Sequence, residues 1–151
     1  MKKELTNKLR NAIKNKSNKY TSHIFELGDN LIAKKSRLGR TKNEYKINKF
    51  LYENEISVPE PLELIKPDNL FRRYFPGGIK NCFLIRKDIS GEGLSYLNIN
   101  LQPKAFEKYT QELDKSRKLG LIPVDFGGNN GIFNFQEQKV YLIDFEAWKM
   151  N

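Results

Sequence analysis

The chain has 151 residues, 38% of them hydrophobic and 12% aromatic, which suffices for one compact domain or two small lobes with a buried core. Its single cysteine, Cys82, excludes an internal disulfide and a cysteine cluster, and its single histidine, His23, argues against a histidine metal site or a Ser/His/Asp triad. The formal net charge of +9 favours phosphate-bearing partners such as nucleotides, RNA or anionic lipid, although lysines spread evenly over a surface give the same balance.

The sequence contains no signal for a membrane. No apolar stretch reaches the roughly 18 residues that a membrane-spanning helix needs. The first 16 residues carry charges throughout and lack the apolar centre of a secretory signal. We therefore expect a cytoplasmic protein.

A helix and a β-hairpin are the first predicted elements. Apolar side chains at helical spacing predict a helix over residues 4–14, inside a segment, residues 2–19, that concentrates positive charge. Strand-like runs at residues 23–27 and 30–36 flank Gly28-Asp29-Asn30, which is typical of a hairpin turn. The basic segment is interpreted either as an arm that binds RNA or DNA or as a solvated surface.

A second helix follows the hairpin. Thr41 as N-cap and Glu44 three residues later match a capping box, so the helix is predicted to start at Thr41 and to end before Pro59. Strand-like runs follow at residues 62–66, 70–75 and 82–87.

The second half of the chain has a different pattern. Residues 103–120 read as a long helix, with Pro103 near its start and Gly120 as its C-cap. A loop at residues 121–135 and a strand-like run at residues 139–145 then predict a terminal hairpin.

Five separated residues are of the types that phosphoryl transfer from ATP requires: Lys34, Glu44, Asp125, Asn130 and Asp144. In this reaction a lysine held by a helix glutamate positions the α- and β-phosphates, an aspartate accepts the hydroxyl proton, and an asparagine and a second aspartate hold magnesium. Each residue also has a structural explanation, as a surface lysine, a capping residue or a turn residue. Their order, spacing and predicted local structure together favour a kinase.

Three segments resemble the protein-kinase-like superfamily, especially its small atypical branch with the RIO-type kinases and the kinase subunit of the KEOPS tRNA-modification complex. RLGRTKNEYKINKFLYENEISVP, residues 37–59, resembles the family's Arg-Thr-x-x-Glu helix followed by Gly-Ile/Val-x-x-Pro. FLIRKDISGEGL, residues 83–94, resembles the hinge that receives adenine, closed by Gly91. GLIPVDFGGNNGIFNFQEQKVYLIDFEAW, residues 120–148, resembles the catalytic loop and the metal aspartate, and is the most specific of the three.

The resemblance implies an α+β, minimal bilobal protein-kinase-like fold over residues 1–151. Residues 1–88 would form an N-lobe of antiparallel sheet plus helix, and residues 89–151 a short helical C-lobe with a catalytic-loop hairpin. The implied activity is an ATP- and Mg²⁺-dependent phosphotransferase of the atypical serine/threonine kinase type. Its acceptor would be a protein serine or threonine, the enzyme itself or a small-molecule hydroxyl.

The resemblance also implies a role for each site residue. Lys34 would anchor phosphates, Glu44 would orient Lys34, Lys87 and its neighbours would offer backbone groups to adenine, Asp125 would act as base, and Asn130 and Asp144 would bind Mg²⁺. A literal Asp-Phe-Gly at residues 125–127 suggests another register, with Asp125 as the metal ligand. That register would put the catalytic loop inside the predicted helix at about residues 105–118, where no Asp-x4-Asn pair exists.

The sequence departs from the family at several places. Pro123 stands where the family has histidine, Glu146 replaces the glycine after Asp144-Phe145, and the expected phosphate-covering segment, residues 15–23, contains no glycine. The chain also stops seven residues after Asp144, without the later helices of ordinary kinases. These departures favour the alternative of an inactive kinase-like scaffold that binds nucleotide, RNA or a protein through its basic surface. So short a second lobe also suggests a homodimer or a bound partner.

Overall fold

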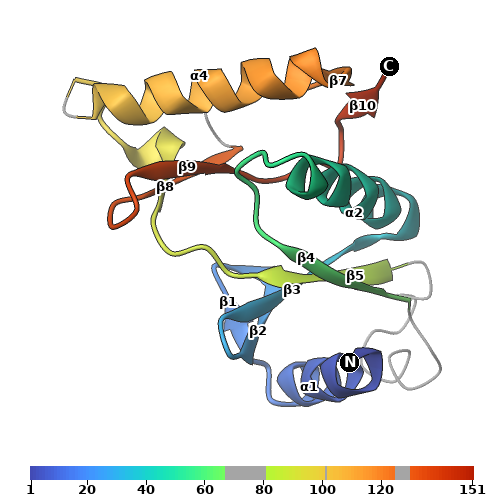
Figure 1. The fold of residues 1–151 in the computed structure, drawn as a ribbon. Helices are drawn as coiled ribbons and strands as arrows, with labels where there is room; N and C mark the ends of the chain where they lie inside the picture. Colours follow the sequence, from blue (N-terminus) through green and yellow to red (C-terminus); the bar gives the residue numbers. More distant parts are fainter. Residues whose placement is uncertain (67–80, 101, 125–129) are drawn as a thin grey trace. The chain divides into compact units, whose positions relative to one another are not determined.

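The structure is a computed structural model that describes residues 1–66, 81–100, 102–124 and 130–151 (Figure 1). Two compact units make up the chain: Met1–Tyr45 with Pro61–Asp88, and Lys46–Glu60 with Ile89–Asn151. The chain thus passes into the second unit after residue 88, where the lobe boundary was expected, and residues 46–60 pack within the second unit. None of the helices in the described ranges is both long and apolar enough to cross a membrane.

An antiparallel five-stranded sheet, in the order β1-β2-β3-β5-β4, forms the first unit. Its strands are β1 (Asn18–Lys19), β2 (Thr21–Gly28), β3 (Leu31–Arg37), β4 (Pro61–Ile65) and β5 (Asn81–Lys87). The predicted hairpin is confirmed, because β2 pairs with β3 and the turn residues Gly28, Asp29 and Asn30 all have positive φ. The predicted strand at residues 70–75 lies outside the described residues.

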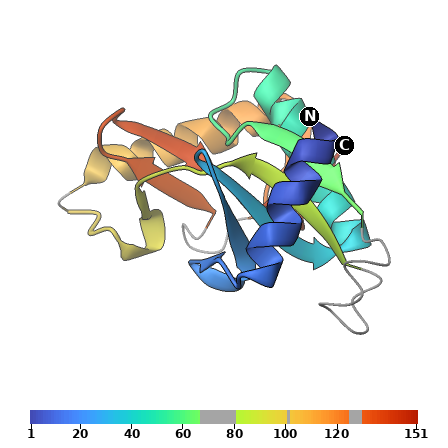
Figure 2. The same ribbon diagram turned by 90° about the horizontal axis from the view of Figure 1, so that it is seen from below.

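The basic N-terminal segment begins as helix α1 (Lys2–Lys14), which lies along the sheet of the first unit (Figure 2). The predicted helix is confirmed, and its apolar stripe is buried. The stripe packs with the side chains of β2, β3 and β5 in one core: Leu5, Leu9, Ala12, Ile13, Phe25, Ala33, Phe83 and Ile85. The positive charge of residues 2–14 is therefore presented on a docked helix, not on an extended arm.

Helix α2 (Leu38–Glu53) begins three residues before the predicted capping box. The expected role of Thr41 as N-cap is wrong. Thr41 lies inside the helix, is 1% exposed, and donates its hydroxyl to the Arg37 carbonyl. Because β3 runs directly into the helix at Arg37, no loop separates the two elements and no capping residue is needed at Thr41.

The second unit is built around helix α4 (Pro103–Lys118), which confirms the predicted helix. The C-cap is Leu119, and Gly120, which was predicted as the C-cap, follows it at φ 89°. The terminal hairpin is also confirmed as β8 (Gly131–Asn134) and β9 (Lys139–Leu142). Short elements complete the unit: β6 (Glu92–Gly93) beside β8, the 3-10 turn η2 (Leu94–Tyr96), and the pair β7 (Leu121–Ile122) with β10 (Lys149–Met150).

The core of the second unit joins α4, the β8–β9 hairpin and the end of α2. It contains Ile47, Leu51, Ile56, Val58, Leu94, Ala105, Tyr109, Leu113, Leu121, Phe133, Val140, Leu142, Phe145 and Trp148. Residues 56–58 are held against this core through polar contacts as well, since the Ser57 amide donates to the Glu112 carboxylate and the Ser57 carbonyl accepts from Leu142. This explains why residues 46–60 pack with the second half of the chain.

Candidate active site

Lys34 and Glu44 form an ion pair inside the first unit, in which Glu44 is buried and Lys34 partly buried. Lys34 lies on β3, an inner strand paired with β2 and β5, and Glu44 lies on α2. The Lys34 Nζ is 3.0 Å from Glu44 Oε2 and 3.2 Å from Oε1, and the two side chains are 13% and 2% exposed. A carboxylate this deeply buried requires a charged partner, and the pair holds the ammonium group at a fixed place beside the sheet.

The expected phosphate-covering segment, residues 15–23, follows α1 and forms β1 and the first part of β2. Tyr20 makes the turn between the strands at φ 67°. The Asn18 amide donates to the Ser22 carbonyl across this turn, and the Thr21 hydroxyl accepts from the His23 backbone. The segment without glycine is thus ordered by asparagine and threonine side chains.

The end of β5, where Lys87 was expected to begin the adenine-binding hinge, is tied to two other strands. Lys87 is exposed and pairs with Leu31 of β3. The next residue, Asp88, accepts a 2.6 Å hydrogen bond from Lys19 Nζ and 3.2 Å bonds from the Tyr20 hydroxyl. The bond to Asp88 is the main cause that raises the pKa of Lys19. The β1–β2 turn is therefore fastened to the start of the expected hinge.

This contact was missed by sequence reasoning. The hinge segment was considered only for its backbone groups, and Lys19 lies 69 residues before Asp88 in the chain. The only signal was an acidic residue directly after a strand-like run, which is also common in turns.

Gly91, expected to close the hinge, occupies a position that only glycine fits. Its φ is 141°, and a Cβ at this residue would collide with the carbonyl of Phe133. The chain thus passes close to the backbone of β8 at this point.

Asn130 and Asp144 lie on neighbouring segments of the second unit. Gly131 pairs with Leu142, and one residue further the Asn130 carbonyl accepts a 2.8 Å hydrogen bond from the Ile143 amide. Asn130 is 5% exposed, and its side-chain amide donates to the Val124 carbonyl. The side-chain nitrogen of Asn130 is thereby used to fix the loop.

Asp144 comes two residues after the end of β9 and has a φ of 62°. Such a left-handed conformation is uncommon for a residue with a side chain and persists only where the surroundings enforce it. Here the next residue, Phe145, is fully buried and meets Trp148 edge to face, with ring centroids 4.9 Å apart. The aromatic pair anchors the backbone directly after Asp144.

Magnesium prefers oxygen ligands, and the Asn130 amide and the Asp144 carboxylate offer oxygens on adjoining segments. Asp125, the expected base, lies outside the described residues, as does the loop up to residue 129. Among the described residues, no group of three His, Cys, Asp or Glu side chains could hold a metal ion by itself. Two oxygen ligands from Asn130 and Asp144 would leave coordination positions that phosphate oxygens and water can fill.

Asn48 on α2 is a buried polar residue that the sequence reading missed. It is 1% exposed, and neither its amide nitrogen nor its oxygen has a hydrogen-bond partner in the described part of the chain. It lies one turn after Glu44, among the apolar positions of α2, so the helical pattern gave no reason to distinguish it from a solvated asparagine.

Comparison with solved structures places the fold. The PK-1 kinase of Cydia pomonella granulovirus matches 87% of this chain with a TM-score of 0.62 and 14% sequence identity. The chain spans about half the length of that kinase, since the match covers 50% of it. No protein-family model matches the sequence, and no curated protein does. At this identity the likeness shows the fold alone: the chain has an α+β, minimal bilobal protein-kinase-like fold.

Proposed function

We propose that the protein is an ATP- and Mg²⁺-dependent phosphotransferase of the small atypical kinase type, related to the RIO-type and KEOPS-complex kinases. The observation that carries the proposal is the Lys34–Glu44 ion pair, whose carboxylate is buried. A lysine on an inner strand, oriented by a helix glutamate, is the arrangement that positions the α- and β-phosphates of ATP in kinases. A pair formed only for stability would gain little over apolar residues at the same places.

In this proposal each residue acts on its own part of the reaction. Lys34 neutralises phosphate oxygens, and backbone groups at Lys87 and the following residues bind adenine. Asn130 and Asp144 hold Mg²⁺, which supplies charge neutralisation at the phosphates when it is bound. The acceptor hydroxyl oxygen forms a bond to the γ-phosphorus, the bond from that phosphorus to the β–γ bridging oxygen breaks, ADP leaves, and the hydroxyl proton passes to Asp125.

Two features of the described chain favour a second candidate, a kinase-like scaffold that binds nucleotide without transferring phosphate. Pro123 stands two residues before Asp125, and Glu146 follows Asp144-Phe145. Glu146 brings a second carboxylate close to the expected metal site along the chain. For the phosphotransferase, we propose that the phosphate acceptor is a protein serine or threonine, the enzyme itself or a small molecule.

The test is transfer of labelled phosphate from ATP by the unaltered protein and by two lysine variants. Lys34→Met removes the phosphate-binding charge, and Lys35→Met is the matched control, because neighbouring residues of a strand point to opposite faces. The proposal expects transfer by the unaltered protein and by Lys35→Met, with none above background by Lys34→Met. If the unaltered protein binds ATP but transfers no more phosphate than Lys34→Met to any acceptor or to water, the scaffold is the correct function.

A further inference from the structure

Helix α2 carries an exposed stripe of three lysines: Lys42, Lys46 and Lys49. Their spacing of four and three residues puts them on one face of the helix, because residues three and four apart are neighbours on a helical surface. The face ends at Glu53, one turn after Lys49. The stripe is distinct from Lys34 and Glu44, which form an ion pair with each other.

The charges of this stripe are not compensated within the described chain. In the described part of the chain, none of the three lysines lies within salt-bridge distance of a carboxylate, and none has a hydrogen bond through its side chain. The other helices differ. On α1, Lys8 pairs with Glu4 and Asp29. On α4, Lys115 pairs with Glu112, and Arg117 with Asp114.

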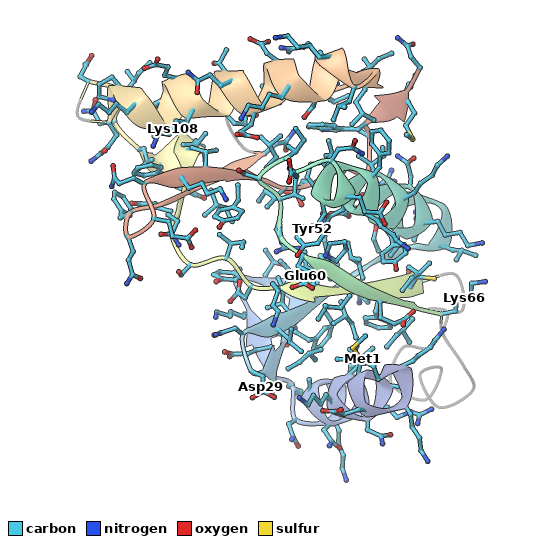
Figure 3. The ribbon with its side chains drawn as sticks, viewed as in Figure 1. Met1, Asp29, Tyr52, Glu60, Lys66 and Lys108 are labelled. Atoms are coloured by element: carbon cyan, nitrogen blue, oxygen red, sulfur yellow. The ribbon has the colours of Figure 1, made fainter. Side chains whose placement is uncertain are left out.

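Lys42 of the stripe has an electrostatic effect within the first unit that it shares with Lys66. Lys42 and Lys66 both act on the buried Cys82 thiol, where their charges oppose the burial that raises the pKa of Cys82. Lys66 is exposed at the end of β4 (Figure 3). Lys42 and Lys66 thus act on the same thiol.

An exposed aromatic ring lies beside the last lysine. Tyr52, three residues after Lys49, is 45% exposed (Figure 3). Tyr45 is half-buried, and no aliphatic side chain is exposed among residues 42–53. Lysines next to an exposed aromatic ring are typical of surfaces that bind single-stranded nucleic acid, where the cations follow the backbone and the ring stacks on a base. A protein-binding surface would instead need an apolar centre.

We propose that the face of α2 formed by Lys42, Lys46, Lys49 and Tyr52 binds single-stranded nucleic acid. From Lys42 to Lys49 the helix rises about 10.5 Å. A single strand whose bases are stacked as in a duplex advances about 3.4 Å per nucleotide, and so presents about three phosphates over that length, one for each lysine. The proposal does not depend on phosphoryl transfer, because none of these four residues belongs to the proposed phosphate, adenine or metal sites.

The test is the salt dependence of binding to a fluorescent oligouridine about 12 nucleotides long, within the usual range of site sizes. Each lysine–phosphate contact with a single strand contributes about −0.7 to the slope of log K against log salt. The variant Lys42→Gln/Lys46→Gln/Lys49→Gln should therefore lower the magnitude of the slope by about 2. In the unaltered protein, the salt dependence of these three contacts should by itself weaken binding about 20-fold between about 50 and 200 mM salt.

Two matched variants separate the stripe from net charge and from the N-terminal basic segment. Lys104→Gln/Lys115→Gln/Lys118→Gln on α4 and Lys3→Gln/Lys14→Gln/Lys16→Gln on the N-terminal segment also remove three exposed lysines each. All three variants change the net charge from +9 to +6, which is 9 minus 3. The proposal expects the slope of log K against log salt to become smaller only in the α2 variant. Equal losses in all three, or a loss confined to the N-terminal variant, would overturn it, as would absence of binding at low salt.

The variant Tyr52→Ala tests whether the ligand is single-stranded nucleic acid. Stacking on an aromatic side chain is worth enough that its loss should weaken oligouridine binding about fivefold or more, with no change in the salt slope. Unchanged affinity in Tyr52→Ala, or binding of a poly-glutamate peptide as tight as that of the oligonucleotide, would overturn the assignment to single-stranded nucleic acid. Thermal unfolding of each variant verifies that it remains folded.

Discussion

The Lys34 ammonium lies 3.0 Å from the Glu44 carboxylate, and Glu44 is almost completely withdrawn from solvent. The ion pair joins an inner strand of the sheet to helix α2. Charged groups in such a position destabilise the fold strongly when only one of them is removed, because the other remains buried without a counter-charge.

This dependence gives a stability prediction that does not involve catalysis. Lys34→Met and Glu44→Leu should each lower the free energy of unfolding by about 3 to 5 kcal/mol. The double variant should recover much of that loss, since no charge is then left buried. Urea unfolding of the four proteins measures the coupling between the two residues. If the two single losses simply add in the double variant, the pair does not act as a unit.

Nucleotide binding should stabilise the native protein. ATP with Mg²⁺ at about 100 times its dissociation constant should add about 2.7 kcal/mol to the free energy of unfolding. For a chain of this size that corresponds to a rise in melting temperature of roughly 5 to 10 °C. The measurement is a thermal shift assay, with ATP plus a chelator as the control for metal dependence. Absence of any shift at millimolar nucleotide would reject the proposed binding site.

The two aspartates are expected to do different work. Asp144→Asn should weaken Mg²⁺-dependent nucleotide binding, because a full negative charge facing a divalent cation is lost while asparagine still accepts the left-handed backbone of this position. Asp125→Asn should leave nucleotide binding nearly intact and lower turnover by about 10²- to 10⁴-fold.

Binding and phosphate transfer are measured for each of these variants with labelled ATP. The chosen register would be wrong if Asp125→Asn abolished metal-dependent binding while Asp144→Asn had no effect. In that case Asp125-Phe126-Gly127 would be the metal-binding tripeptide.

The buried side-chain amide of Asn48 should destabilise the folded protein. Because neither of its polar atoms has a partner in the described chain, Asn48→Leu should raise the free energy of unfolding by about 1 to 3 kcal/mol. The control is Asn54→Leu, which removes an exposed amide that donates to the Phe50 carbonyl and should bring no gain. Chemical denaturation measures both. A loss of stability in Asn48→Leu would indicate that the amide has a partner when the protein is in solution.

Alkaline pH should destabilise the β8–β9 hairpin through Tyr141. Burial, and then the hydrogen bond to Glu137, raise the pKa of Tyr141 to about 12, against about 10 for an ordinary tyrosine. The unfolded chain therefore releases this proton first, so stability is complete below about pH 10 and declines as the pH rises to about 12. Tyr141→Phe should lack this part of the decline. Equal pH dependence of urea unfolding in both proteins would contradict the prediction.

Local pattern alone predicted most of the secondary structure. The spacing of Leu5 and Leu9, the Gly28-Asp29-Asn30 turn, and Pro103 at the start of α4 each depend on neighbours a few residues away, and each prediction was confirmed. Gly120, predicted as the C-cap of α4, lies one residue beyond it, because Leu119 is the C-cap. The capping box failed for a tertiary reason. Thr41 and Glu44 have the right spacing, but the continuous passage from β3 into α2 places both inside the helix.

The sequence by itself determined which chemical groups are available: a strand lysine, a helix glutamate, and an asparagine and an aspartate near the terminal hairpin. Only the tertiary structure decided their surroundings. It set the burial of Glu44, the left-handed backbone of Asp144 above the Phe145–Trp148 pair, and the bond from Lys19 to Asp88. Burial and contacts between residues far apart in the chain arise from packing, and no local pattern of residues encodes them.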